Sequence, residues 1–91
     1  MTTIGVAGAG SIGASLIRLL HTSPAARSLR LKTVLVRDAA RPRPELPAGT
    51  PLTACPAELT DDPQIDVVVE LLGGVDEPFG IVSRALSQGK A

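Results

Sequence analysis

Three glycines stand close together in the segment GVAGAGSIGASL, which covers residues 5–16. Gly8, Gly10 and Gly13 follow the spacing G-x-G-x-x-G. A glycine inside a strand or helix costs roughly 0.5–1 kcal/mol relative to alanine, so this cluster indicates a need for the missing side chains. In this spacing the first glycine permits a tight turn, the second lets the backbone approach a pyrophosphate, and the third lets a helix pack closely. The predicted phosphate-binding residues are Gly8, Ala9, Gly10, Ser11, Ile12 and Gly13.

The residues on either side of the glycines supply the context that such a site needs. Residues 3–7 are a short apolar run, which predicts a buried strand. From Ser11 onward apolar residues recur at helical spacing until Pro24, which predicts an amphipathic helix whose first amides face a bound phosphate. The alternative is that the glycines serve only a tight strand-to-helix turn. A P-loop is excluded because no Gly-Lys-Ser/Thr follows.

The end of the second predicted strand, within residues 29–37, bears on the choice of cofactor. An acidic residue there holds the adenosine ribose hydroxyls of NAD, whereas an arginine accommodates the 2′-phosphate of NADP. This chain has Arg37 followed by Asp38, so the signal is mixed. Arg41 and Arg43 lie nearby, which favours NADP over NAD. The alternative is that Arg37 and Asp38 are ordinary solvated charges in a loop.

A third group of residues follows the apolar run at residues 65–72. Its β-branched residues show no alternation, which indicates a strand buried on both faces, as in a parallel sheet. Gly73 and Gly74 come next and leave room for a nicotinamide ribose, or they form a plain turn. We expect Glu70 to hydrogen-bond to this neighbouring loop.

The order of elements predicts the fold class. The chain alternates strand and helix, with a proline-rich loop at residues 39–51, a short strand at 51–54 and a closing helix that ends near Gly89. Such alternation is typical of an α/β protein with a parallel sheet and right-handed crossovers. We expect a Rossmann-like half-fold of about four strands in the order 3-2-1-4, with helices on both faces. We expect residues 1–91 to form one NAD(P)-binding domain, incomplete and without a substrate domain.

Composition excludes several other classes of protein. The formal net charge is zero and Phe79 is the one aromatic residue, so we expect no binding to nucleic acid or to a membrane surface. No apolar run approaches membrane-spanning length, and the first residues lack the basic region of a secretion signal. Cys55 is the single cysteine and is expected to be buried, which fits a cytoplasmic protein. No metal-ligand cluster is present.

Three segments together resemble the start of homoserine dehydrogenase. They are IGVAGAGSIGASLIRLL, LKTVLVRD and DPQIDVVVELLGGVDEPFGIVSRALSQGK, and they cover nearly the whole chain apart from the proline-rich loop. The resemblance implies the cofactor-binding part of an NADP- or NAD-dependent enzyme that interconverts aspartate semialdehyde and homoserine. It also implies that Leu72, Gly73 and Gly74 lie beside the nicotinamide half of the cofactor.

The resemblance assigns no catalytic residue, because the family's catalytic lysine and aspartate lie beyond the part that matches this chain. Two alternatives stay open: a free-standing nucleotide-binding or interaction module that is not catalytic, and the cofactor domain of another NAD(P)-dependent reductase. A family member would continue into a further strand after residue 91. We therefore expect one edge of the strand at residues 66–71 to be unpaired, and the isolated chain to self-associate through it.

Overall fold

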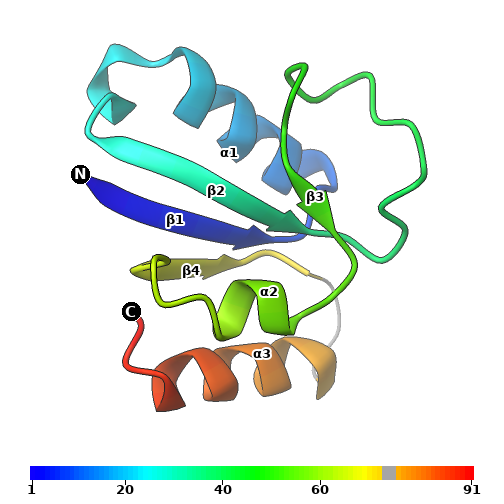
Figure 1. Cartoon of the computed structure of the whole chain (residues 1–91). Coiled ribbons are helices and arrows are strands. Elements are labelled where there is room, and N and C mark those ends of the chain that lie inside the picture. The colour runs from blue at the N-terminus through cyan, green and yellow to red at the C-terminus, as the bar shows by residue number, and fades with distance from the viewer. Residues whose placement is uncertain (73–75) are drawn as a thin grey trace.

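The computed structural model describes residues 1–72 and 76–91, which form a parallel sheet with helices on both sides (Figure 1). In chain order the elements are β1 (Thr2–Ala7), α1 (Ser11–Thr22), the 3-10 turn η1 (Pro24–Ala26), β2 (Leu29–Leu35), β3 (Leu52–Thr53), α2 (Ala57–Thr60), β4 (Val67–Glu70) and α3 (Asp76–Ser87). Apart from the loop that joins β2 to β3, strands and helices alternate as the sequence predicts, so the α/β class is confirmed.

The sheet has the order β3-β2-β1-β4, and every neighbouring pair is parallel. The predicted order 3-2-1-4 is therefore confirmed. β1 lies in the middle of the sheet, where Val6 is paired with Val34 of β2 on one side and with Val69 of β4 on the other. From β1 the chain first adds β2 and β3 on one side and then adds β4 on the other, so the strand order reverses between β1 and β4. A ligand crevice is expected outside the carboxyl ends of β1 and β4.

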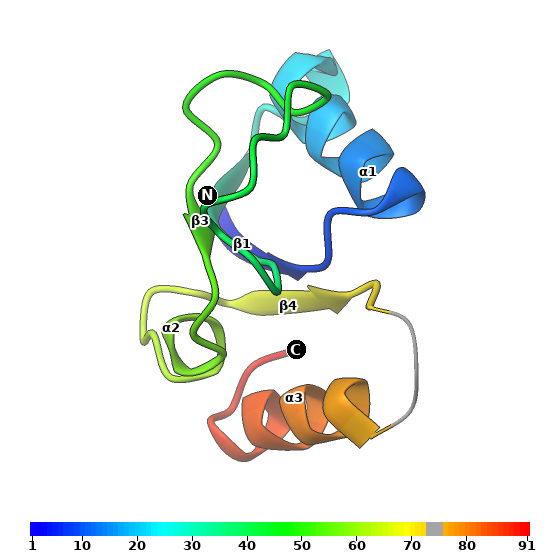
Figure 2. The ribbon, with the colours of Figure 1, turned by 90° about the vertical axis from the view of Figure 1, so that its right-hand side faces the viewer.

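Two apolar cores lie on opposite faces of the sheet. α1 covers one face, and α2 and α3 cover the other, as Figure 2 shows from the side. Successive strand residues point to opposite faces. Val6 and Val34 accordingly pack with Ile17 of α1, whereas Ala7 and Leu35 belong to the core beneath α2 and α3. The two faces of β1 and β2 are thus covered by different helices, one face by α1 and the other by α2 and α3.

The proline-rich segment 39–51 has no helix or strand, as predicted, but it is anchored to the rest of the fold. Leu46 is buried in the same core as α1, with 8% of its surface exposed. The guanidinium of Arg18 on α1 donates a hydrogen bond to the carbonyl of Glu45 at 3.1 Å. These two contacts hold the loop against α1, next to the carboxyl end of β2.

β4 differs from its prediction in burial. Its residues Val67–Glu70 are all half-buried, so the expectation of a strand buried on both faces is wrong in degree. Val67 and Val69 pack against the core under α1, and Val68 packs against the core under α3. Both faces are therefore covered, but incompletely. The reason is that β4 has four residues and lies at the end of the strand order.

The outer edge of β4 is partly paired by the chain's own C-terminal residues. The N–H of Val68 donates to the carbonyl of Ala91 at 2.9 Å, and the N–H of Ala91 donates to the carbonyl of Asp66 at 3.0 Å. Gly89, with a φ of 79°, turns the chain back from α3 toward this edge. The expectation of a wholly unpaired edge is therefore wrong, because Ala91 occupies the start of the position that a fifth strand would take.

The side chain of Lys90 holds this C-terminal turn in place through two hydrogen bonds. It is buried, with 8% of its surface exposed, and its Nζ donates to the carbonyl of Asp62 at 2.5 Å and to that of Ile65 at 2.8 Å. A buried ammonium group needs such acceptors, because an unpaired charge inside a protein is costly. The turn from α3 is thereby joined to the segment that leads into β4.

Candidate functional site

The glycine turn between β1 and α1 depends on Gly8 for its shape. Gly8 has a φ of 109°, which side-chain-bearing residues rarely adopt. A Cβ atom at this position would stand 3.0 Å from the carbonyl carbon and oxygen of Leu71. The N–H of Gly8 donates to the carbonyl of Leu35 at 2.8 Å, which ties the turn to β2. Gly8 thus supplies the predicted tight turn at the end of β1.

Gly13 allows α1 to approach that turn. A Cβ atom at Gly13 would be 2.4 Å from the carbonyl oxygen of Gly8 and 2.9 Å from its carbon. Real Cβ contacts are essentially never closer than 3.0 Å. The predicted packing role of Gly13 is confirmed, and its partner is the backbone of the turn itself.

Gly10 has no such structural reason to be a glycine. Its φ of −71° is open to any residue, and a Cβ atom there would meet nothing within 4 Å. Gly10 is the N-cap of α1, which has neither a side-chain cap nor an acidic residue in its first turn. Ser11 and Ile12 are exposed at this helix start. The backbone amides of the first turn are therefore available to an anion, and the helix dipole favours one.

A cavity of about 520 Å³ opens beside this helix start. Its lining comes from the glycine turn, the end of β2, the loop that follows β2 and the end of β4: Gly8, Ala9, Gly10, Val36, Arg37, Arg41, Arg43, Leu71 and Leu72. A second hollow of about 480 Å³ runs along the first turns of α1 and shares Ala9, Gly10 and Arg41 with the cavity. Together they lie at the carboxyl ends of the strands, where the topology places a ligand.

Arg37 and Asp38, the residues predicted to hold the adenosine ribose, have different surroundings. Arg37 lines the cavity, and Asp38 is absent from its described lining. Oδ1 of Asp38 accepts a hydrogen bond from the N–H of Ala40 at 3.0 Å, so the carboxylate closes a turn in its own loop. The carbonyl of Asp38 accepts a second bond, from Nη2 of Arg43 at 3.0 Å.

The far side of the cavity is formed by the end of β4. Leu72 is half-buried and lines the cavity with Leu71. Oε1 of Glu70 accepts a hydrogen bond from the N–H of Leu72 at 2.5 Å, which confirms the prediction that Glu70 bonds to the neighbouring loop. The predicted site residues Gly73 and Gly74 lie outside the described residues. Of the three residues that the resemblance places beside the nicotinamide half, the structure therefore describes Leu72 alone.

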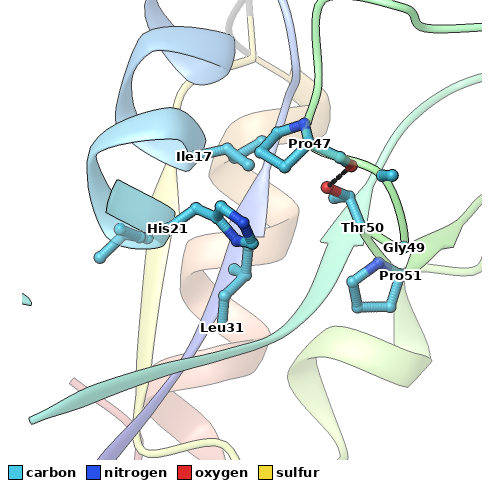
Figure 3. A pocket seen from close by; sticks show the side chains of 9 residues that line it. Ile17, His21, Leu31, Pro47, Gly49, Thr50 and Pro51 are labelled. Carbon is cyan, nitrogen blue, oxygen red and sulfur yellow. Dashed lines mark hydrogen bonds between the residues drawn. The ribbon is translucent and has the colours of Figure 1, made fainter. Parts of the chain in front are cut away.

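Another cavity, of about 260 Å³, lies near the carboxyl end of α1, away from the glycine turn (Figure 3). Ile17 and His21 of α1 face Pro47 and Thr50 of the proline-rich loop, with Leu31 of β2 below His21 in the view. The Thr50 hydroxyl donates to the carbonyl of Pro47 at 2.6 Å and so closes the turn that forms one wall. The described lining of this cavity contains no arginine and no helix N-terminus, so it does not suit phosphate groups.

Shifted pKa values occur at the opposite end of the sheet from the glycine turn. A hydrogen bond from Arg84 holds the pKa of the Asp61 carboxyl below its usual value, and one from Lys32 does the same for Asp62. The Arg84–Asp61 pair makes two bonds, at 3.0 and 3.1 Å. These pairs join α2 and β2 to neighbouring elements, and their chemistry is that of structural ion pairs.

Other kinds of site find no support in the described part of the chain. Among residues 1–72 and 76–91, no group of three or more histidine, cysteine or acidic side chains is arranged to hold a metal ion. No described helix has the length and apolarity needed to cross a membrane. Cys55 is exposed, so the expectation that it is buried is wrong; it lies in the connection between β3 and α2.

The parallel sheet, its glycine turn at the switch point and the uncapped helix start facing a cavity define a dinucleotide-binding domain of the doubly wound type. The sequence pattern of the family described as homoserine dehydrogenase, NAD binding domain, matches residues 8–91. The chain belongs to this family.

Known homoserine dehydrogenases align with almost the whole chain. The enzyme of Pseudomonas aeruginosa is 35% identical over 94 aligned residues, which cover 96% of this chain and 21% of that relative. The enzyme of Synechocystis is 33% identical, with 96% and 21% covered. The solved homoserine dehydrogenase of Thiobacillus denitrificans has a TM-score of 0.86 at 32% identity and covers 98% of this chain and 22% of that one. The chain thus spans about a fifth of the length of these relatives.

Proposed function

We propose that this chain holds the nicotinamide dinucleotide of a homoserine dehydrogenase that interconverts aspartate semialdehyde and homoserine. One observation carries the assignment to this site: Gly10 is a glycine where the fold itself requires none, at an uncapped helix start beside a cavity. A pyrophosphate next to the backbone accounts for that glycine. The residues present therefore fit the cofactor.

Each part of the cavity has a proposed task. The amides of Ser11, Ile12 and Gly13 bind the pyrophosphate, since they belong to the first turn of α1 and lack intrahelical partners. Arg37 lies against the adenosine ribose, and Leu72 borders the nicotinamide half. When bound, the cofactor supplies hydride transfer. The chain's own contribution is to orient it toward a substrate held elsewhere.

We favour NADP over NAD for this site. The described lining of the cavity contains Arg37, Arg41 and Arg43 and no carboxylate. Asp38, the residue that would accept hydrogen bonds from ribose hydroxyls, is absent from that described lining, and its Oδ1 accepts the N–H of Ala40. An arginine-lined cavity suits a 2′-phosphate, whereas a ribose diol needs an acceptor.

The cofactor proposal is tested by titrating the purified 91-residue chain with NADPH and with NADH. We expect NADPH to bind more tightly. Arg37→Asp is expected to lower the ratio of NADPH to NADH affinity by at least about tenfold, because it replaces a charge-assisted bond with repulsion. Binding of neither dinucleotide by the unmodified chain would refute the proposal. An unchanged ratio in Arg37→Asp would refute only the preference for NADP.

The alternative is a module that binds the dinucleotide without taking part in catalysis. It would bind NADPH in the titration as a dehydrogenase would, so a second experiment distinguishes the two. Neither reading assigns a catalytic residue within the described chain. The described lining of the cofactor cavity holds no histidine, lysine or carboxylate that could accept a proton from a substrate hydroxyl. Homoserine-dependent reduction of NADP by a longer chain that includes these residues, and its absence without them, would favour the dehydrogenase.

We further propose that two copies of the chain associate beside β4. No described strand lies on the outer side of β4, and Ala91 pairs with only its first residues. On the adjacent helix α3, Phe79, Val82 and Leu86 are apolar and exposed, at 71%, 40% and 61% of their surface. Val82 and Leu86 also border a small hollow with Val68. An apolar surface next to a strand edge that is only partly paired is a template for a second copy.

Sedimentation velocity at several concentrations tests the association. We expect a dimer at high micromolar concentration, and a monomer for Leu86→Glu, which places a charge on the α3 surface. Leu19→Glu is the matched control, because Leu19 is an equally exposed leucine on α1, at 59% against 61% for Leu86. A monomer at every concentration, or dissociation by both variants alike, would contradict the proposal.

We place the chain in the cytoplasm. Cys55 is exposed and is the chain's single cysteine, which suits a compartment that keeps thiols reduced. If oxidising conditions abolish dinucleotide binding by the unmodified chain but leave that of Cys55→Ser unchanged, the result would support this location.

A further inference from the structure

The proline-rich loop brings two arginines to the cofactor cavity in addition to the one at the end of β2. Arg41 and Arg43 belong to the segment Arg-Pro-Arg-Pro at residues 41–44, and both line the cavity with Arg37. Arg43 is the better fixed of the two. Its Nη2 donates to the carbonyl of Asp38 at 3.0 Å, while its Nε is enclosed and has no acceptor among the described residues.

The backbone around Arg43 is restrained from several sides. Pro44 restricts the residue before it to extended conformations, and Pro42 fixes its own φ. The carbonyl of Arg43 accepts a hydrogen bond from the N–H of Leu46 at 3.1 Å, and Leu46 is buried in the core. Arg18 binds the loop at Glu45. Arg43 is therefore held at the cavity before any ligand arrives, which reduces the ordering cost of binding.

The three arginines suit a second anionic group, separate from the pyrophosphate. The pyrophosphate is accounted for by the start of α1. The three arginines lie on the β2 side of the cavity, where the topology places the adenosine ribose. The described lining contains no acidic residue. Within the loop, Oδ1 of Asp38 accepts the N–H of Ala40, and Glu45 borders the neighbouring hollow.

We infer that Arg43 is a specificity-determining residue of this site, whose guanidinium donates to the phosphate on the adenosine ribose of NADP. The inference rests on the proposed function. A guanidinium presents several donors in a fixed plane, so the bond to Asp38 orients the group while other donors serve the phosphate. The loop thus acts together with Arg37, and both are needed for full discrimination.

The test compares Arg43→Met with a matched control, Arg27→Met. Methionine keeps much of the apolar stem and removes the charge, and Arg27 is an exposed arginine at the opposite end of the sheet. The 91-residue variants are titrated with NADPH, NADH and 2′,5′-ADP by calorimetry. For Arg43→Met we expect the affinity for NADPH and for 2′,5′-ADP to fall by about tenfold or more, and that for NADH to change by less than about twofold. Arg27→Met leaves all three unchanged.

Arg43→Lys separates a phosphate contact from a purely structural role. Lysine retains the charge but not the planar fork, so we expect it to recover part of the 2′,5′-ADP affinity. That affinity should also fall less steeply with salt in Arg43→Met than in the unmodified chain. Equal losses of NADPH and NADH affinity, or no loss of either, would overturn the inference while leaving the proposed function intact. If the unmodified chain binds no dinucleotide, the proposed function fails and this inference fails with it.

Discussion

Replacing Gly13 with alanine adds one methyl group where the backbone of the glycine turn leaves no room. The new Cβ would stand 2.4 Å from the carbonyl oxygen of Gly8, about 1 Å closer than the start of ordinary van der Waals contact at 3.4 Å. Alanine gains about 1 kcal/mol in helix propensity over glycine. Overpacking of a rigid site costs roughly 1–3 kcal/mol, and here the obstacle is backbone, so the upper end applies. We expect a net loss of about 1–2 kcal/mol in the free energy of unfolding.

The contrasting change is Gly10→Val, at a position with open space and an ordinary φ. Its cost in unfolding free energy should stay below about 1 kcal/mol, the usual range for an unfavourable N-cap. Its NADPH affinity should fall more than about tenfold, because the side chain fills the approach to the amides of α1.

Thermal unfolding followed by circular dichroism without ligand measures the first effect, and NADPH titration measures the second. For a domain of this size Gly13→Ala should lower the Tm by roughly 4–16 °C. The reasoning is refuted if Gly10→Val unfolds as early as Gly13→Ala, or if it binds NADPH like the unmodified chain.

Three further outcomes are expected. The Arg84 hydrogen bond lowers the pKa of the Asp61 carboxyl from 3.8, so its contribution to stability is present above that pH and is lost as the pH falls through the folded-state pKa. Arg84→Gln should return this pKa toward its ordinary value in an NMR titration; an unmoved titration would contradict the assigned cause. Lys90→Met should destabilise the chain by roughly 1–3 kcal/mol in urea unfolding, because the carbonyls of Asp62 and Ile65 lose their shared donor. The 91-residue chain should show no homoserine oxidation, and measurable turnover by a pure sample would show that it contains a proton acceptor.

The sequence predicts most of the fold because the relevant signals are local. Apolar runs and helical spacing locate the elements, and right-handed crossovers leave few ways to order the strands. The roles of Gly8 and Gly13 are predictable for the same reason. Their spacing between a strand and a helix dictates where the two elements meet.

Features that depend on distant partners could not be predicted. The sequence places Arg37 and Asp38 side by side, but only the folded loop shows that Asp38 bonds to Ala40 while Arg37 lines the cavity. The pairing of Ala91 with β4 uses backbone groups alone, so no pattern of side chains in the sequence predicts it. In the sequence Arg43 is one of several neighbouring cations, and its position at the cavity depends on the packing of Leu46 in the core.

The central place of β1 has a consequence for how the chain folds during synthesis. β1 is made first, yet one of its partners, β4, lies more than sixty residues further along, since Ile4 pairs with Val67. Contacts between such distant residues slow folding, because a long loop must close before the contacts stabilise it. Until the ribosome has released β4, one edge of β1 has no strand beside it. A nascent chain is therefore most exposed to wrong pairing through the same strand that later forms the middle of the sheet.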